Sequence, residues 1–377
     1  MSSRHSFPRG RALQALATLT LSACASISLS AQAVPDTLPP VLLIHGIWSS
    51  QATWDVLAPQ LTSAGFNRVF RTSTNTAQAL HDQKDVVKNY ASAVGIQNES
   101  PILVAHSMGG LIARQLSTEL PSDAIITVGS PHNGHTTLNE PGGNANLWYM
   151  SGAIGGAAVD AVWNLSGHCG QQRDGVDAPC YTVGEFLSYT TTVLALIHTV
   201  NTLVISAASI DDMSTESSFI LALNATDHVN SEQASSRISI IAKLYPEEQH
   251  YSMFRMKFNP YIAENLGSYL PWFSAMVQAD GWDILWETIG NTEDPWYWER
   301  IWGAGGVILA GSEIQELPNR YNELIGGWPN DGFMPVATQY YPLATSYDLV
   351  GVAHVEETES FFLRDRVIEV GTAYRRN

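Results

Sequence analysis

The sequence predicts an α/β fold built around a doubly wound, mostly parallel β-sheet. Short aliphatic runs alternate with segments of helical periodicity, which is the order of elements that parallel strands joined by right-handed crossovers require. The runs are apolar throughout, as expected for strands that helices cover on both faces. The chain has 377 residues, of which 45% are hydrophobic, so it is long enough to build a full core.

Strands and helices alternate regularly in the first part of the chain. Buried strands are predicted for VLLIHG (41–46), RVFRTS (68–73), PILVAH (101–106) and AIITVGSP (124–131). Helices are predicted between them, over 50–65, 77–95 and 108–120, and Pro121 stops the last one. The alternation then breaks, and strand-like runs return at GGVILAGS (305–312) and YDLVGVAH (347–354), before a final helix over 359–376. We therefore expect a signal peptide (1–33), a first part of the core (34–139), a helical cap or lid insertion (140–300) and a second part of the core (301–377).

The first 33 residues have the pattern of an export signal. Arg4, Arg9 and Arg11 precede the apolar segment ALQALATLTL, and the small residues AQA end at position 33. Cleavage there would make Val34 the first residue of a secreted or periplasmic protein. The alternative is the segment LSAC, which resembles the lipobox of bacterial lipoproteins and would anchor the protein at Cys24.

Two features of the insertion allow two interpretations each. The apolar stretch 187–210 contains His198 and Asn201, which argues against a membrane span and leaves a lid helix or a buried core helix. Tryptophans gather between Trp272 and Trp302, where they serve either core packing or the wall of a pocket for an apolar substrate.

Cysteine and charge narrow the class of protein further. In an exported chain, Cys169 and Cys180 are expected to form a disulfide; a metal site with His168, Asp174 and Asp177 is the alternative, but its spacing fits no zinc pattern. Acidic residues outnumber basic ones by 36 to 19, which gives a formal net charge of −17. No nucleic-acid partner is expected, because the chain has too few cations to replace the counterions of a phosphate backbone.

The segment PILVAHSMGGLIARQL (101–116) places Ser107 between a predicted strand and a predicted helix. This is the pattern of a nucleophile elbow, in which a sharp turn exposes the serine hydroxyl at the edge of the sheet. Small residues must lie two positions before and after the serine, where Ala105 and Gly109 stand. Ser107 is therefore the candidate nucleophile, with the free amides of a helix N-terminus beside it.

A nucleophile that attacks a carbonyl also needs amide donors, a base and an acid. The strand that ends in His45 and Gly46 predicts that the backbone amides of Ile47 and Met108 bind the oxyanion, and that His45 itself is structural.

In elbow enzymes the acid and then the histidine follow the serine in the chain. His354 follows the last predicted strand and is the candidate base, while His132 and His135 are expected to shape a loop beside the site. Asp331, in the turn NDG after the predicted penultimate strand, is the candidate acid. Asp348 and Glu356 are its rivals.

The segments HGIW, AHSMGG, GSPHNG, NDGFMPV and AHVEE occur in this order, and the chain resembles α/β-hydrolases of the secreted bacterial triacylglycerol lipase type. Residues 228–248 are similar to a segment between the lid and the acid of those lipases. The resemblance implies that no cofactor is required for the reaction. Such lipases often bind a structural calcium ion through an aspartate two residues past the histidine, where this chain has Glu356, with Glu313 as the candidate second ligand. Some members also need a membrane-bound foldase.

Together, these features predict a serine hydrolase that cleaves carboxylic esters of lipid-like substrates through an acyl-enzyme. A lipid–water interface is one place where such an enzyme would meet its substrate. A polyester depolymerase, a phospholipase or an acyltransferase could use the same residues. A binding module on this fold would normally have lost one of the three residues, and this chain has candidates for all of them.

Overall fold

A computed structural model describes residues 38–135, 208–255, 260–289 and 325–376, with some positions between 308 and 323. The predicted signal peptide with Cys24, the predicted Cys169–Cys180 disulfide and most of the apolar stretch 187–210 lie outside the described residues.

The described residues contain a six-stranded sheet in the order β2-β1-β3-β4-β5-β6, and all its neighbouring strands are parallel. The strands are β1 (Val41–Ile44), β2 (Val69–Arg71), β3 (Ile102–His106), β4 (Ser122–Val128), β5 (Ala234–Lys243) and β6 (Thr345–Val350). Because every strand runs the same way, the chain leaves all of them at one edge of the sheet. Catalytic and binding groups collect at this edge in open parallel sheets.

The central strands are aliphatic and buried, as the sequence pattern predicts. Every residue of β1 and β3 is buried. A strand that helices cover on both faces gains from apolar side chains at every position, so it shows no polar alternation. The predicted strands over 41–46, 68–73, 101–106, 124–131 and 347–354 are confirmed.

One predicted strand is wrong, and a different segment completes the sheet. In the run 305–312, the described residues Ile308 and Ser312 are helical. The strand between β4 and β6 is instead β5, which lies inside the range 140–300 predicted as a helical cap. A short apolar run does not by itself distinguish a strand from a buried helical segment, which explains the error. The core therefore includes part of the predicted insertion.

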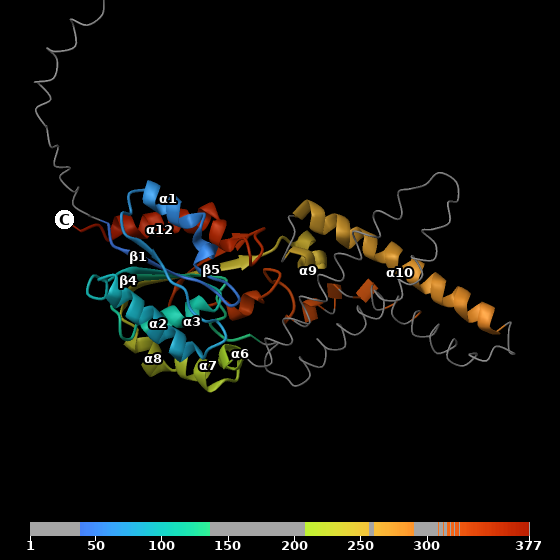
Figure 1. Ribbon diagram of the computed structural model, residues 1–377, viewed down its shortest axis with the longest axis horizontal. Helices are drawn as coiled ribbons and strands as arrows, with labels where there is room; N and C mark the ends of the chain where they lie inside the picture. Colours follow the sequence, from blue (N-terminus) through green and yellow to red (C-terminus); the bar gives the residue numbers. More distant parts are fainter. Residues whose placement is uncertain are drawn as a thin grey trace, which may run out of the picture. The chain divides into compact units, whose positions relative to one another are not determined.

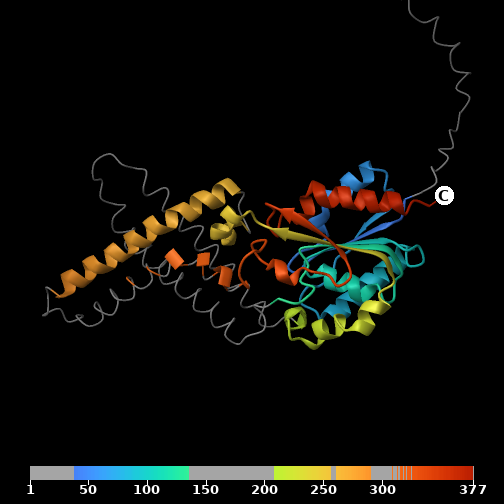
Figure 2. The same ribbon diagram turned by 180° about the vertical axis from the view of Figure 1, so that it is seen from behind.

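Helices cover both faces of the sheet (Figures 1 and 2). Against one face lie α2 (Leu80–Ala93) and α3 (Gly109–Leu116), with α6 (Ala208–Met213), α7 (Ser218–Leu223) and α8 (Thr226–Ser231) around them. Against the other lie α1 (Leu57–Ser63) and α12 (Phe361–Ala373). Two apolar clusters result, one on each side of the central strands.

The chain after β5 forms a short helical segment and then a long helix. The 3₁₀ helix η3 (Pro246–Tyr251) leads into α9 (Ser252–Arg255), and α10 (Pro260–Ile289) follows. On α10, the side chains of Trp272, Trp282 and Trp286 are exposed, so they are not part of a core among the described residues. None of the described helices is both long enough and apolar enough to cross a membrane. The remaining 3₁₀ helices are η1 (Gln51–Trp54), η4 (Val336–Thr338) and η5 (Glu357–Glu359).

Candidate active site

Ser107 lies in a strained turn between β3 and α3. Its φ angle is +55°, a backbone conformation that residues other than glycine rarely adopt. The turn is held from both sides, since the Ser107 amide donates to the Val128 carbonyl at 3.0 Å and the Gly110 amide donates to the Ser107 carbonyl at 3.0 Å. This turn points the hydroxyl toward the edge of the sheet where the strands end.

Glycines next to the turn allow the backbone segments to approach each other. A Cβ at Gly109 would lie 2.6 Å from the carbonyl oxygens of Ile44 and His45, at the end of β1. A Cβ at Gly46 would lie 2.7 Å from the Cβ of Ser107. Only glycine fits at either place, so the loop after β1 lies directly beside the serine.

The structure brings Ser107, His354 and Asp331 into one hydrogen-bonded chain. The Nε2 atom of His354 lies 2.9 Å from the Oγ of Ser107, and its Nδ1 atom lies 3.0 Å from the Oδ2 of Asp331. All three residues are buried. Ser107 follows β3, Asp331 lies between β5 and β6, and His354 follows β6. The parallel sheet thus brings together residues that are far apart in the sequence.

Asp331 is held by its own loop. Its Oδ1 accepts the backbone amides of Phe333 at 2.9 Å and Met334 at 2.6 Å, and its Oδ2 accepts the Nε2 of Gln339 at 3.2 Å. Gln339 in turn pairs with the backbone of Ala242 near the end of β5, through bonds of 2.8 and 3.0 Å. The carboxylate is thus fixed relative to the sheet before it meets the histidine.

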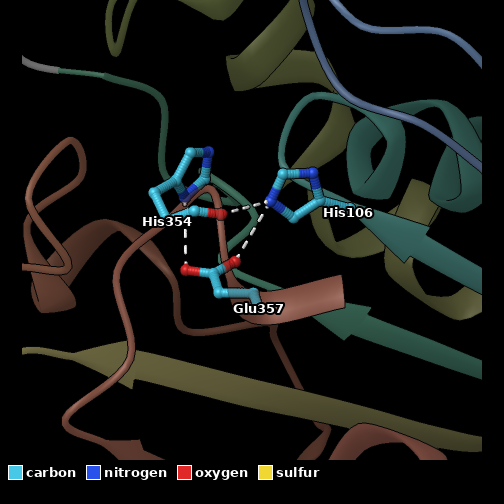
Figure 3. A group of neighbouring side chains, drawn as sticks. All are labelled: His106, His354 and Glu357. Atoms are coloured by element: carbon cyan, nitrogen blue, oxygen red, sulfur yellow. Dashed lines mark hydrogen bonds and ion pairs between the residues drawn. The ribbon is translucent and has the colours of Figure 1, made fainter. Parts of the chain in front are cut away.

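A second carboxylate, Glu357, also contacts His354 and was missed in the sequence. Its Oε1 lies 3.2 Å from the Nδ1 of His354, and its Oε2 lies 3.2 Å from the Nε2 of His106 (Figure 3). The Nε2 of His106 also lies 3.0 Å from the carbonyl oxygen of His354. A glycine makes room here, because a Cβ at Gly129 would lie 2.0 Å from the Glu357 Oε2. The sequence feature that could have identified Glu357 is its spacing from His354, because residues three apart in a helical turn share a face.

The two carboxylates determine which nitrogen of His354 carries a proton. Carboxylates only accept hydrogen bonds, so in the neutral imidazole the proton lies on Nδ1 and the lone pair of Nε2 faces the serine hydroxyl. Burial would lower the pKa of His354, but the charges of Glu357 and Asp331 raise it. Burial raises the pKa of Asp331, whereas His354 and His106 lower that of Glu357 against the effect of its burial. Glu357 is therefore the more firmly ionised of the two acids.

A comparison with known protein families identifies the family of the chain. The model of the alpha/beta hydrolase family matches residues 41–320, well over half of the chain. The chain belongs to the alpha/beta hydrolase family. The matched region ends before Asp331 and His354, so the family assignment does not depend on them.

Solved structures similar to this alpha/beta hydrolase are distant. The mature form of a lipase from Bacillus licheniformis has 11% sequence identity and a TM-score of 0.43, with 89% of this chain and 92% of that chain covered. A probable hydrolytic enzyme from Pseudomonas aeruginosa has 12% identity and a TM-score of 0.35, with 88% and 85% covered. No curated protein matches the sequence.

In this alpha/beta hydrolase, the residues predicted to bind an oxyanion flank Ser107. Met108 directly precedes the first residue of α3, so its amide lies at the N-terminus of that helix. Ile47 follows Gly46, where an added Cβ would lie 3.2 Å from the Oγ of Ser107. Their roles stay predictions. The structural role expected for His45 is consistent with its contacts, since its Nε2 accepts the Thr74 amide at 3.1 Å and its Nδ1 lies 2.8 Å from the Gly46 carbonyl.

His132 and His135 form hydrogen bonds with groups other than the three candidate catalytic residues. The Nε2 of His132 lies 2.9 Å from the Oγ1 of Thr127. The Nε2 of His135 lies 3.0 Å from the carbonyl oxygen of Phe333, and the Phe333 ring lies 5.3 Å from the ring of His354. Burial lowers the pKa of His135 to about 4, so this ring is neutral and holds the acid loop by a hydrogen bond. The expected role of shaping the loop is consistent with these contacts.

The remaining candidates of the hydrolase have other partners. Asp348, a rival for the acid, is exposed and forms an ion pair with Lys243 at 2.6 Å. Glu356, the second rival and a calcium candidate, forms an ion pair with Arg255. Glu313 lies outside the described residues.

One group in the described part of the chain has the donor types of a metal site. His106, His354 and Glu357 place their ligand atoms within 4.8 Å of one another. The nitrogens that face Glu357 carry the protons of the hydrogen bonds described above, so a metal ion would have to displace those protons. The hydrogen-bonded arrangement suits a proton-transfer chain better than a metal centre.

Proposed function

We propose that this alpha/beta hydrolase is a serine esterase that cleaves carboxylic esters of lipid-like substrates through an acyl-enzyme. The observation that carries the proposal is the chain from the Ser107 hydroxyl to His354 Nε2 at 2.9 Å and from His354 Nδ1 to Asp331 at 3.0 Å. A serine in this strained turn, with the Nε2 of a carboxylate-paired imidazole facing it, has the geometry of an activated nucleophile.

Each residue has one role in the proposed reaction. Ser107 attacks the ester carbonyl while His354 Nε2 takes its proton, and the amides of Ile47 and Met108 bind the oxygen that becomes negative. His354 then gives the proton to the leaving alkoxide. Water, activated by the same histidine, releases the acid from Ser107. Asp331 and Glu357 hold the imidazole in its tautomer and stabilise its positive charge.

Replacement of Ser107 tests the nucleophile. We expect Ser107→Ala to lower kcat on p-nitrophenyl esters by about 10⁴-fold or more, since the remaining oxyanion donors alone account for little of the rate. A fluorophosphonate probe should label the wild-type protein and not the variant. Wild-type rates in the folded Ser107→Ala variant would contradict the proposal, and a folded wild-type protein that resists the probe would favour a binding module.

The proposed substrate class, lipid-like esters, is inferred from the sequence and not from the geometry of the site. Rates on tributyrin, a long-chain triglyceride, lecithin and a polyhydroxyalkanoate separate lipase, phospholipase and depolymerase activity. A product ester formed in the presence of an alcohol would instead indicate acyl transfer.

We also propose that the enzyme is exported. The Arg-rich start, the apolar segment and the AQA sequence before Val34 support this. Mass spectrometry of the mature N-terminus distinguishes a chain that begins at Val34 from one acylated at Cys24. Thiol counting with and without reductant tests the Cys169–Cys180 disulfide.

A further inference from the structure

The residue expected to bind calcium beside His354 is already bound to an arginine. The carboxylate of Glu356 faces the guanidinium of Arg255, with one oxygen 3.0 Å from Nη1 and the other 2.9 Å from Nη2. Calcium binds through six to eight oxygen ligands. A calcium ion at Glu356 would lie against a positive charge that already uses both carboxylate oxygens, so these residues do not fit the metal.

The arginine is placed as a built-in cation. Its side chain is 1% exposed, and its Nε donates to the Oε1 of Glu248 at 3.0 Å. Glu248 is itself 4% exposed in its side chain. A planar guanidinium that faces two carboxylates forms a directed, charge-assisted contact that a flexible lysine does not reproduce. Arg255 therefore fixes the position of the Glu356 carboxylate and also neutralises its negative charge.

Glu356 in turn determines the shape of the histidine loop. Its Oε2 accepts the backbone amide of Ala353 at 3.2 Å, and its own amide donates to the Ala353 carbonyl at 2.8 Å. His354 lies inside the turn that these two bonds close. A movement of the Glu356 carboxylate would therefore move the backbone that carries the imidazole.

The same short segment, residues 246–255, holds the acid loop. The Nε2 of Gln249 donates to the Asn330 carbonyl at 3.0 Å, and the Asn330 amide donates to the Oε1 of Gln249 at 3.3 Å. Asn330 directly precedes Asp331. Gln249 and Arg255 thus connect both loops, acid and base, to one segment that leaves the end of β5.

We propose that Arg255 is a positioning residue that performs, for the His354 loop, the role of a structural cation, so that this loop needs no calcium ion. The proposal rests on the proposed function only where it concerns rates; its calcium part does not. Among the described residues, Arg255 donates hydrogen bonds to Glu248 and Glu356, neither of which is the proposed nucleophile, base or acid.

Kinetics of Arg255 variants test the positioning role. We expect Arg255→Ala to lower kcat on p-nitrophenyl butyrate by roughly 10- to 100-fold, because a shift of the base by about 1 Å misaligns it with Ser107. KM should change little. Arg255→Lys and Glu356→Gln, which disturb the fold less, should show smaller losses in the same direction. Added ethylguanidinium should restore part of the rate of Arg255→Ala.

Arg68→Ala is the matched control. Arg68 forms a two-pronged ion pair with Glu99 next to the start of β2, at the opposite edge of the sheet. Both variants are expected to lower Tm, but only Arg255→Ala should lower kcat per mole of folded protein. If Arg255→Ala keeps the wild-type kcat per folded molecule, or if Arg68→Ala loses as much, the positioning role is wrong.

The need for calcium is tested on the full-length wild-type protein by measuring Tm and the esterase rate. EGTA and added calcium should change neither. In Arg255→Ala, calcium should raise Tm, because Glu248 and Glu356 are then carboxylates without their cation. A wild-type protein that loses Tm or rate in EGTA would overturn the proposal. If the wild-type protein cleaves no ester at all, the proposed function fails, while the Tm comparison still decides whether Arg255 replaces calcium.

Discussion

At the residue scale, the unusual feature of the site is that His354 has two acidic neighbours instead of one. Asp331 has three amide donors of its own, whereas the described partners of Glu357 are the two histidines, His354 and His106. Burial disfavours two charges in one place, and the pKa values shift in opposite directions as a result. The protein resolves the conflict by keeping Glu357 ionised next to the imidazole.

The pH dependence of the rate should report this second acid. His354 accepts a proton only when it is neutral, and its pKa lies above the ordinary 6.5. The kcat/KM of the wild-type protein should therefore rise with pH through a limb above neutrality. Glu357→Gln removes one negative charge, so we expect the limb to move down by about one pH unit and the plateau to fall by about tenfold.

Glu359→Gln is the control for Glu357→Gln. It makes the same change of charge on the same 3₁₀ turn, but its side chain is exposed. It should leave the limb in place. A limb that stays put or moves to higher pH in Glu357→Gln would show that this carboxylate does not act on the histidine.

The sequence predicts the nucleophile, base and acid candidates better than it predicts their neighbours. Ser107 is marked by a strand–turn–helix pattern, and His354 and Asp331 by their order after it. Glu357 carries no such pattern, because its importance arises only when η5 folds it back onto His354 and Gly129, just after β4, leaves room for it. Arg255 is likewise visible only in the folded chain, since its partner Glu356 lies about 100 residues away.

At the element scale, α3 and β1 approach more closely than side chains would allow. The helix begins at Gly109, directly over the carbonyl oxygens of Ile44 and His45. This contact sets the position of the helix N-terminus, and with it the Met108 amide and the turn of Ser107. The absence of a side chain at Gly109 thus helps to position the hydroxyl of Ser107.

Gly109→Ala tests this contact, because the close approach predicts a loss of stability where helix propensity predicts a gain. Alanine in a helix usually gains up to about 1 kcal/mol over glycine. Here its Cβ would lie 2.6 Å from two backbone oxygens, so we expect a loss of about 1–3 kcal/mol in the free energy of unfolding. Urea denaturation measures it, and the esterase rate should fall with it. Gln115→Ala, on the same helix, should leave both nearly unchanged, whereas a stabilised Gly109→Ala protein would contradict the close approach.

The strands that the sequence predicts correctly are those whose apolar runs are flanked by clear helices. The element it misses, β5, follows a segment whose fold the sequence does not indicate, and its run ASSRISIIAK begins with polar residues. Those polar residues lie at the start of the strand, where β5 is only partly buried, while its end is as apolar as the others. The run 305–312 is more uniformly apolar and has the composition of a strand, but β5 occupies the position between β4 and β6.

At the scale of the whole molecule, charge opposes contact with negative surfaces. The formal net charge is −17 with a pI of about 4.9, so at neutral pH the protein is repelled by anionic droplets or membranes. This repulsion acts before any substrate enters the site. It is screened over a distance of about 10 Å at 0.1 M salt, which makes it easy to separate from the chemistry.

We therefore expect the rate on a neutral long-chain ester to depend on how the ester is presented. At low salt, droplets coated with an anionic detergent should be hydrolysed roughly tenfold more slowly than droplets coated with a zwitterionic lipid, because fewer molecules reach the surface. Added salt should remove most of the difference. A short, water-soluble neutral ester should show no such dependence in the same buffers. Faster hydrolysis of the anionic droplets at low salt would mean that a local basic surface, and not the net charge, governs the approach of this protein to its substrate.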